Sequence, residues 1–364
     1  MSLGRTRLNV VVAGGGTAGH IDPAMNLADE ILRRHPDARI TALGTSRGLE
    51  TTLVPGRGYP LELIPAVPMP RRVNVDAFTL PIRLRNAVRT TRSIFDRVDA
   101  QILVGFGGYV AIPAYLAARG QVPFIVHEAN AKPGLANRIG ARFADAVAET
   151  VLGSLPDARH TGVPLRSAIT TLDRAAMRTQ ARDYFGISQD VRVVLVFGGS
   201  QGAQSINGTV AQCLDQGVFD DVTVIHAVGM KNEFPAEPTH NYRPYAYLDR
   251  MDLAYAASDF VISRSGAMTV AEISAVGLPA CFVPFPIGNG EQSLNALPVV
   301  NANGAVLVRD QEFSADYVRN VIMPIMHSPE TLSTMGSQSK SVGRADASAR
   351  LADLVEEVLA KVQL

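Results

Sequence analysis

Short runs of β-branched residues alternate with longer helical stretches along this chain, and two of these runs lead directly into glycines. Residues 8–13 precede the glycines at 14–16, and residues 191–197 precede the glycines at 198–199 about half a chain later. Such alternation predicts parallel sheets covered by helices, and its repetition predicts two doubly wound domains. The expected fold class is therefore α/β.

A turn-prone segment near Gly162 and Pro164 interrupts this alternation. The length of 364 residues also favours about two domains. We expect an N-terminal domain at 1–162, a C-terminal domain at 163–345 and a last helical segment at 346–364, which carries an apolar stripe and should be packed. Ligands of doubly wound sheets bind at the carboxyl ends of the strands, so the predicted site is a cleft between the two domains.

The composition excludes several classes of protein. A hydrophobic share of 47% is too high for a disordered chain. Equal numbers of basic and acidic residues, 34 each, give no overall attraction to nucleic acid or to anionic membranes. The two cysteines lie in no ligand-spaced cluster, and neither a signal peptide nor an apolar run of membrane-spanning length is present. We therefore expect a protein of the cytosol or of its membrane surface.

The first glycine loop, residues 14–19, has the G-x-G-x-x-G spacing between a strand and a helix. Backbone N–H groups and a helix N-terminus can receive a phosphate in this geometry. A dinucleotide cofactor is disfavoured, because the second strand, 40–43, ends in Gly44, Thr45 and Ser46 rather than in an acidic residue. A tight turn that needs glycine only for close packing is the remaining alternative.

The second glycine loop, residues 198–202, matches the G-x-S-x-G pattern of serine hydrolases around Ser200. A hydrolase would need an acid and then a histidine later in the chain, and His226 follows too soon to leave room for that acid. Ser200 fits better as a hydroxyl and amide contact to a phosphate.

A third loop, residues 263–269, leaves a strand and opens the helix that carries Glu272. Its small residues allow a diphosphate to approach the helix N-terminus, whose free N–H groups favour anions. Glu272 could accept both hydroxyls of a ribose, or it could be a solvated carboxylate that complements the helix dipole.

The chain resembles the MurG family of peptidoglycan glycosyltransferases in six motifs that follow one another in order. They extend from residue 11 to about residue 298 and so cover most of the sequence. The motifs are Gly15-Gly16-Thr17-Ala18-Gly19-His20, Gly105-Phe106-Gly107-Gly108-Tyr109, His127-Glu128-Ala129-Asn130, Gly198-Gly199-Ser200-Gln201-Gly202-Ala203, Arg264-Ser265-Gly266-Ala267-Met268-Thr269, and Glu291-Gln292 through Asn295-Ala296.

The resemblance implies a GT-B fold, in which two Rossmann-like domains face a central cleft and the last helix crosses back onto the N-terminal domain. It implies inverting, metal-independent transfer of N-acetylglucosamine from UDP-N-acetylglucosamine to the 4-hydroxyl of the muramyl sugar of lipid I, which gives lipid II for peptidoglycan synthesis. No cofactor and no nucleic acid are expected. The implied surroundings are an anionic membrane surface at the cytoplasmic face of the cell membrane and other cell-wall synthesis proteins.

The resemblance also implies roles for individual residues. Donor contacts are expected from Arg166, Ser200, Leu248, Ala267, Met268, Thr269, Glu272 and Gln292. Residues expected to close over the sugar from the other side are Thr17, Ala18, Gly19, His20 and Asn130. Glu291 stands where the family often has glutamine or histidine, and a carboxylate can only accept hydrogen bonds where an amide could also donate.

The transfer needs a proton acceptor and a stabilised leaving group. His20 is the favoured base, because an imidazole with an unperturbed pKa near 6.5 is mostly neutral in the cytosol; the alternative is that it only bonds a phosphate or its own helix. Glu128 is the reserve base, with a structural carboxylate as its alternative. Arg166 and backbone amides after Ser265 and at Ser200 should stabilise the departing diphosphate.

A basic segment is expected to contact the membrane. Residues 71–97 contain seven arginines (71, 72, 83, 85, 89, 92 and 97) and two aspartates, in a chain that is neutral overall. Arg85, Arg89 and Arg92 fall on one helical face, and an apolar loop at 64–70 precedes the segment. Anionic lipid would attract this face, although an ordinary amphipathic helix with a solvated basic side is the alternative.

Two other functions are compatible with the same motifs. Another GT-B enzyme acting on UDP-sugars, such as a glycolipid synthase or a UDP-N-acetylglucosamine 2-epimerase, would share the two glycine loops; the epimerase would need no membrane-facing basic segment. A non-catalytic nucleotide-sugar sensor would bind the donor without releasing UDP and would tolerate the loss of His20.

Overall fold

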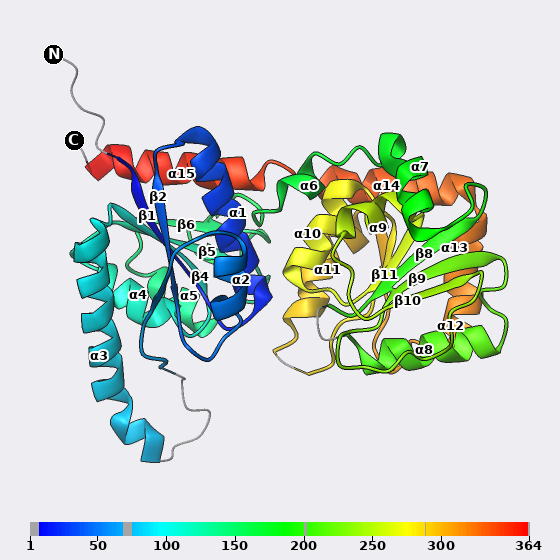
Figure 1. Ribbon diagram of the computed structural model, residues 1–364, viewed down its shortest axis with the longest axis horizontal. Coiled ribbons are helices and arrows are strands. Elements are labelled where there is room, and N and C mark those ends of the chain that lie inside the picture. Colours follow the sequence, from blue (N-terminus) through cyan, green and yellow to red (C-terminus); the bar gives the residue numbers. More distant parts are fainter. Residues whose placement is uncertain (1–6, 68–74, 200–201, 288, 363–364) are drawn as a thin grey trace. The chain divides into compact units, whose positions relative to one another are not determined.

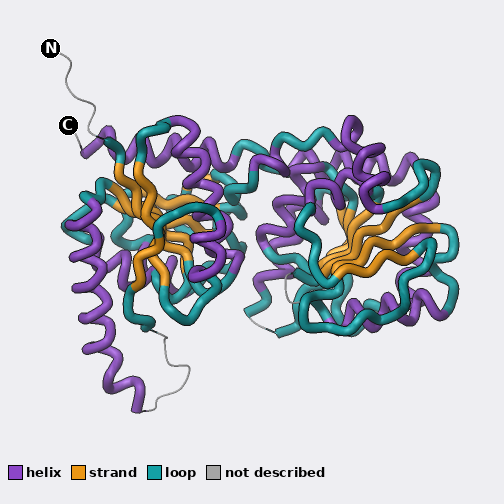
Figure 2. The backbone as a smooth tube through the Cα atoms, in the orientation of Figure 1, coloured by secondary structure: helices purple, strands orange, loops and turns teal. Residues whose placement is uncertain are grey.

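The computed structural model describes residues 7–67, 75–199, 202–287 and 289–362. The chain forms two compact units. The first contains Met1–Leu165 together with Asp346–Leu364, and the second contains Arg166–Ala345. In each unit the strands lie inside and helices cover them (Figure 1, Figure 2). Within the described ranges, every helix is too short or too polar to span a bilayer.

The first unit is built on a seven-stranded sheet with the order β3-β2-β1-β4-β5-β6-β7, in which all neighbouring strands are parallel. The strands are β1 Asn9–Gly14, β2 Arg39–Gly44, β3 Leu61–Leu63, β4 Ile102–Gly107, β5 Phe124–Glu128, β6 Ala146–Glu149 and β7 Arg159–His160. Because the strands are parallel, β1, β4 and β5 all end at the same edge of the sheet, and the residues that follow them meet there.

Helices cover both faces of this sheet. They are α1 Ala18–Arg34, α2 Glu50–Gly56, α3 Val75–Val98, α4 Ala111–Ala118, α5 Leu135–Gly140 and α15 Ala347–Val362. On one face, Val10 and Val12 of β1 pack with α1 and with Leu351 of α15. On the other face, Val11 and Ala13 pack with α3 and α4. Side chains alternate across a strand, so a strand buried on both faces appears in the sequence as a continuous apolar run.

The last helix, α15, packs against α1 of the first unit (Figure 1). Leu351, Leu354, Val355 and Val358 of its apolar stripe are buried, whereas Val362 at its end is exposed. The expectation of a packed last helix is therefore confirmed.

The second unit repeats the architecture with a six-stranded parallel sheet of order β10-β9-β8-β11-β12-β13. Its strands are β8 Arg192–Phe197, β9 Val222–Ala227, β10 Tyr242–Tyr245, β11 Phe260–Ser263, β12 Ala280–Phe282 and β13 Ala305–Leu307. The helices are α6 Ser167–Thr170, α7 Arg174–Phe185, α8 Gln204–Asp215, α9 Met251–Ala257, α10 Ala267–Val276, α11 Glu291–Asn301, α12 Ala315–Tyr317, α13 Met323–His327 and α14 Pro329–Val342, with a π-helical turn at Val318–Ile322. The expected α/β class with two doubly wound, Rossmann-like sheets is confirmed.

Candidate functional site

Two glycine-rich turns interlock at the carboxyl edge of the first sheet. Gly14 is the last residue of β1, and Gly15 follows it. Gly107 is the last residue of β4, and Gly108 follows it. A Cβ atom added to Gly108 would lie 2.1 Å from the carbonyl oxygen of Gly15, and one added to Gly14 would lie 2.2 Å from that of His20. Gly107 and Gly108 also have positive φ, 101° and 81°, which favours glycine. Close backbone packing therefore accounts for these glycines.

His20 lies in the first turn of α1, with its ring against the β4 turn. Its Nδ1 is 3.1 Å from the hydroxyl oxygen of Thr17, and a Cβ atom on Gly107 would be 3.2 Å from its Nε2. Burial lowers the pKa of His20, while the charge of Glu128 and a hydrogen bond with the Gly15 backbone act in the opposite direction. The imidazole is therefore neutral at neutral pH and has one nitrogen that accepts a proton.

Glu128, the last residue of β5, is buried and heavily hydrogen-bonded. Its carboxylate accepts bonds from the backbone N–H groups of Asn130 at 2.9 Å and Gly134 at 3.0 Å, and from the side-chain amide of Asn137 at 2.9 Å. The side-chain amide of Asn130 is also within 3.3 Å of it. This arrangement fixes the loop after β5 and supports the structural interpretation of Glu128.

Asn137, on α5, is a member of this site that sequence reasoning missed. Its amide also donates to the carbonyl of His127 at 3.0 Å, and its carbonyl accepts from the hydroxyl of Tyr115 at 2.8 Å. Asn137 thus links α4, α5 and the end of β5 around Glu128. The only signal in the sequence is an asparagine in a short helix seven residues beyond Asn130, which is too weak to single it out.

Glu50, the first residue of α2, was also missed. It is fully buried and accepts a hydrogen bond from the backbone N–H of Gly16 in the first glycine loop. Sequence reasoning looked for an acidic residue at the end of β2 and found none, yet Glu50 brings a carboxylate back to that place from six residues beyond Gly44.

The remaining predicted residues of the first unit gather at the same edge. Thr17 and Gly19 are exposed, and Ala18 and Asn130 are half-buried. Thr17 precedes α1 and contacts His20, while Asn130 contacts Glu128. The structure therefore brings together the loop after β1, the loop after β4 and the loop after β5.

In the second unit, α10 begins directly after β11 with Gly266 as its N-cap. Ala267, Met268 and Thr269 form its first turn and are half-buried. The first N–H groups of a helix have no partner within the helix, so this turn offers donors to an anion. The hydroxyl of Tyr255 donates to Glu272 at 2.9 Å.

Arg166 belongs to the same region. It is the exposed N-cap of α6, a helix that contacts α10. Burial raises the pKa of Tyr255 well above its ordinary value, Glu272 adds to this effect and the charge of Arg166 opposes it. Tyr255 is thus close enough to interact with both Arg166 and Glu272. Leu248, in the loop between β10 and α9, is buried.

A cavity of about 510 Å³ opens beside the second glycine loop. Its wall includes Gly198, Gly202, Asn232 and Gln292. Gln292 accepts a hydrogen bond from the backbone N–H of Phe285 at 2.9 Å through its carbonyl oxygen, which directs that side chain. Ser200, the remaining predicted contact, lies outside the described residues.

Arg264 also contributes to the wall of this cavity. It donates to the carbonyls of Val283 at 3.0 Å and Pro284 at 3.1 Å, and it pairs with Asp310. Through its other nitrogen it reaches the hydroxyl of Ser205 at 2.8 Å. One buried guanidinium thus connects the loops after β11, β12 and β13 with α8.

The structure disfavours the hydrolase interpretation of the second loop. Both ring nitrogens of His226 are engaged, one with the hydroxyl of Tyr242 at 3.0 Å and the other with the side-chain carbonyl of Asn207 at 3.1 Å. Burial lowers the pKa of His226 to about 3. Because His226 has no exposed surface and both of its nitrogens bond inside the second unit, it is not available as the base for a serine in the loop.

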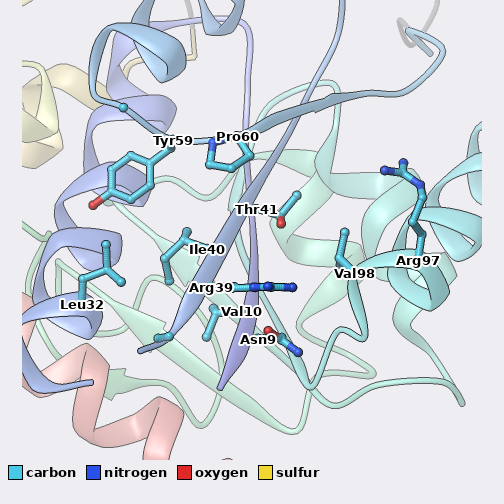
Figure 3. A pocket seen from close by; sticks show the side chains of 12 residues that line it. Asn9, Val10, Leu32, Arg39, Ile40, Thr41, Tyr59, Pro60, Arg97 and Val98 are labelled. Atoms are coloured by element: carbon cyan, nitrogen blue, oxygen red, sulfur yellow. The ribbon is translucent and has the colours of Figure 1, made fainter. Parts of the chain in front are cut away.

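A further cavity, of about 430 Å³, lies elsewhere in the first unit. Asn9 and Val10 at the start of β1, Arg39 and Ile40 at the start of β2, and Tyr59 contribute to its wall (Figure 3). It is at the amino ends of the strands, so it is separated from the glycine loops by the length of the sheet. Within the described ranges, no three histidine, cysteine or acidic side chains cluster in a way that could hold a metal ion.

Comparisons with known proteins identify relatives along nearly the whole chain. The glycosyltransferase family 28 N-terminal domain matches residues 10–149, and the glycosyltransferase family 28 C-terminal domain matches residues 193–351. A UDP-N-acetylglucosamine–N-acetylmuramyl-(pentapeptide) pyrophosphoryl-undecaprenol N-acetylglucosamine transferase from Saccharopolyspora erythraea is 53% identical over 98% of this chain and 96% of its own length. The enzyme of the same name from Mycolicibacterium smegmatis is 54% identical over 96% of this chain and 94% of its own.

Solved structures show the same fold. The crystal structure of Acinetobacter baumannii MurG matches with a TM-score of 0.78 and 24% identity, over 96% of this chain and 99% of that one. The UDP-N-acetylglucosamine 2-epimerase of Neisseria meningitidis matches with a TM-score of 0.68 and 15% identity, over 97% and 100% of the two chains. At these identities the likeness concerns the fold alone.

Proposed function

This chain belongs to glycosyltransferase family 28 and to its MurG enzymes, and we propose that it transfers N-acetylglucosamine from UDP-N-acetylglucosamine to lipid I, giving lipid II. The observation that carries this proposal is the identity of 53% to a transferase of that name over 98% of the chain. The sites described above, at the carboxyl edges of two doubly wound sheets, are where such folds bind nucleotides and sugars.

The second unit is the proposed donor site. The first turn of α10, with Ala267, Met268 and Thr269, would bind the diphosphate through backbone N–H groups. Glu272 would accept the ribose hydroxyls, because a carboxylate accepts hydrogen bonds in several directions and Tyr255 orients it. The backbone around Leu248 would contact the nucleobase of the donor. Gln292 would contact the sugar at the wall of the 510 Å³ cavity. Ser200 is proposed as a further phosphate contact.

The first unit supplies the proposed acceptor side. His20 is neutral and would remove the proton of the muramyl 4-hydroxyl as that oxygen attacks the anomeric carbon. Glu128 would hold Asn130 and the loop after β5, since its oxygens already accept several internal hydrogen bonds. Thr17, Ala18 and Gly19 would line the approach to the reacting sugar.

Leaving-group stabilisation follows from fixed dipoles. As the glycosidic bond breaks, negative charge grows on the β-phosphate of UDP. N–H groups at the start of α10 and the guanidinium of Arg166 interact more strongly with this growing charge than with the intact donor, which lowers the barrier. We therefore propose a transfer in which these groups take the part that a divalent cation plays in other glycosyltransferases.

The enzyme would work at the cytoplasmic face of the cell membrane, because its acceptor carries a lipid. Helix α3 runs along one side of the first unit and extends beyond the sheet (Figure 1). Arg85 and Arg89 are exposed on it, and Ile82 is 66% exposed. These residues are the proposed peripheral contact with anionic lipid. An association with other cell-wall synthesis proteins stays a prediction from the family resemblance.

Part of the expected apolar loop does not fit such a contact. Ile64 and Val67 are buried in the first unit, so these two side chains do not reach a membrane. Residues 68–74, which include Arg71 and Arg72, lie outside the described residues. Arg97 is ion-paired with Glu62 at 2.7 Å, which reduces its contribution to the basic face.

The direct test is to mix the purified protein with UDP-N-acetylglucosamine and a lipid I analogue, with and without EDTA. We expect release of UDP and formation of a disaccharide product at equal rates in both samples. Turnover that requires a divalent cation would contradict the leaving-group proposal. UDP release without an acceptor-linked disaccharide would contradict the transferase assignment.

A further inference from the structure

We propose that Glu50 is a positioning residue for the transfer, because it holds the first glycine loop in the conformation that presents the His20 imidazole. This inference rests on the proposed function of His20 as the base. Glu50 lies outside the six motifs that link the chain to its family, and its role follows only from the contacts in the folded structure.

The carboxylate of Glu50 joins two loops that follow adjacent strands. Its Oε2 accepts the backbone N–H of Gly16, after β1, at 3.0 Å. Its Oε1 accepts both the backbone N–H and the hydroxyl of Thr45, after β2, at 2.8 and 3.0 Å. Three donors therefore converge on one carboxylate that has no exposed surface.

Three glycines make room for this carboxylate. A Cβ atom on Gly48 would lie 1.8 Å from Oε2 of Glu50, and one on Gly44 would lie 2.5 Å from its Cγ. A Cβ atom on Gly15 would lie 3.2 Å from Oε1. The first two distances are far below van der Waals contact, so side chains at Gly44 or Gly48 would displace Glu50.

Glu50 acts as an ionised acceptor. Burial by itself would raise its pKa, but the hydrogen bonds from Gly16 and Thr45 outweigh burial and hold the pKa below its ordinary value. Hydrogen bonds to a charged acceptor are stronger than those between neutral groups. The first glycine loop is therefore held by a charge-assisted hydrogen bond from Gly16 to Glu50.

The residues on either side of Gly16 both bind His20. The Gly15 backbone forms a hydrogen bond with the imidazole, and the hydroxyl of Thr17 is 3.1 Å from its Nδ1. When Glu50 fixes the Gly16 amide, it fixes both of these partners. The Glu50 carboxylate also occupies the backbone N–H of Gly16. This N–H therefore supports His20 and does not donate to a substrate phosphate.

Two substitutions break this contact in different ways. Glu50→Gln keeps the shape but replaces one oxygen with an amide NH₂, so either Gly16 or Thr45 faces a donor instead of an acceptor. Gly48→Ala keeps the charge of Glu50, but the added Cβ atom pushes the carboxylate away from Gly16. Gly48 lies in a partly exposed loop. Val54→Ala, on the same helix, is the matched control, because it removes buried core packing without touching the glycine loop.

The first measurement is an NMR titration of the histidines in the full chain without substrate, with His20→Ala to assign the resonance. In the wild type, His20 should titrate below 6.5. In Glu50→Gln and Gly48→Ala the released loop admits water to the ring and weakens its hydrogen bond with Gly15. Burial is the largest of the effects on the His20 pKa, so that pKa should rise towards its ordinary value. The same His20 titration in wild type and in both folded variants would overturn the proposal.

The second measurement is steady-state transfer. Both variants should lose about 10- to 100-fold in kcat, part of what a general base contributes, with the KM for UDP-N-acetylglucosamine changed less than about two-fold. Val54→Ala should lower the melting temperature and leave kcat within about two-fold. A loss of kcat in Val54→Ala equal to that in Glu50→Gln would assign the effect to stability and overturn the proposal. If the wild type transferred no sugar, the proposed function would fail, and the titration would still decide whether Glu50 positions His20.

Discussion

At the scale of single residues, the first unit separates carboxylates that hold loops from a histidine that can react. Glu50 and Glu128 are both buried, and each accepts three or more internal hydrogen bonds. His20 is half-buried and neutral at neutral pH. These environments favour His20 over Glu128 as the proton acceptor, because most of the acceptor capacity of Glu128 is already used.

Replacing His20 tests this assignment directly. His20→Ala should lower kcat by about 100- to 10,000-fold, the range that a general base contributes, with little change in the KM for the donor. Product formation should be followed with a lipid I analogue at saturating donor. Retention of most of the wild-type turnover would remove His20 from the chemistry. Arg33→Ala, at the exposed end of the same helix, is the control and should leave kcat unchanged.

The pH dependence of kcat has a definite sign. Burial lowers the pKa of His20 below its ordinary value of 6.5, so the reactive neutral form persists down to that lowered pKa. Activity should therefore be flat through neutral pH and fall as pH drops below about 6.5, with an inflection that disappears from the residual rate of His20→Ala. An inflection above 7 would contradict a base with a lowered pKa.

At the scale of elements, the two faces of helix α3 have different proposed roles. One face packs in the core of the first unit, and the other is the proposed contact with lipid. Thr91 and Phe95 are buried, and Phe95 packs in the same core cluster as Leu103 of β4. Arg85 and Arg89 face outward. Each basic residue near an anionic membrane contributes on the order of 1 kcal/mol, so this face can bias the first unit towards lipid without a spanning helix.

Charge reversal on α3 should weaken lipid binding. We expect Arg85→Glu with Arg89→Glu to reduce co-sedimentation with vesicles containing anionic lipid by about ten-fold or more, and we expect wild-type binding to weaken at high salt. Arg309→Glu with Arg319→Glu changes the net charge equally at exposed positions of the second unit. Equal losses in the two double variants would show that net charge, and not this face, determines binding.

At the scale of the whole molecule, each unit has its own parallel sheet and its own buried histidine. Burial lowers the pKa of His127 to about 4 in the first unit and that of His226 to about 3 in the second. An unfolded histidine takes up a proton near pH 6.5. Between pH 6.5 and these lowered values the unfolded chain binds more protons than the folded one, so folding stability decreases as pH falls.

This linkage gives a measurable acid sensitivity. Stability should be full at about pH 7.5 and above, and each buried histidine should remove about 2 kcal/mol between pH 7.5 and 5. Urea unfolding at pH 7.5 and pH 5 would measure this loss of stability. It should be followed by far-UV circular dichroism, because the chain has no Trp for fluorescence. His226→Gln should lower stability at both pH values and reduce the difference between them. An unfolding midpoint that does not change with pH would contradict the neutral state of both histidines.

The sequence by itself determined the class of the fold and indicated the loops that carry the proposed sites. Periodicity and strand-to-glycine turns are local properties, and they predicted β1, β8 and the helices that follow them. The order of six motifs indicated the family, since family-specific residues such as His20, Glu128 and Gln292 are recognised by their neighbours along the chain.

Only the tertiary structure showed which residues support those sites. Glu50 is 34 residues from Gly16 in sequence, and the hydroxyl of Tyr115 is 22 residues from Asn137. Whether a buried carboxylate or amide meets its donors depends on distances of a few ångströms between separate loops, and these distances are fixed by the packing of strands and helices that no local pattern encodes. For this reason His20 could be proposed as the base from its motif, whereas the carboxylate of Glu50 that holds its loop could be found only after the chain was folded.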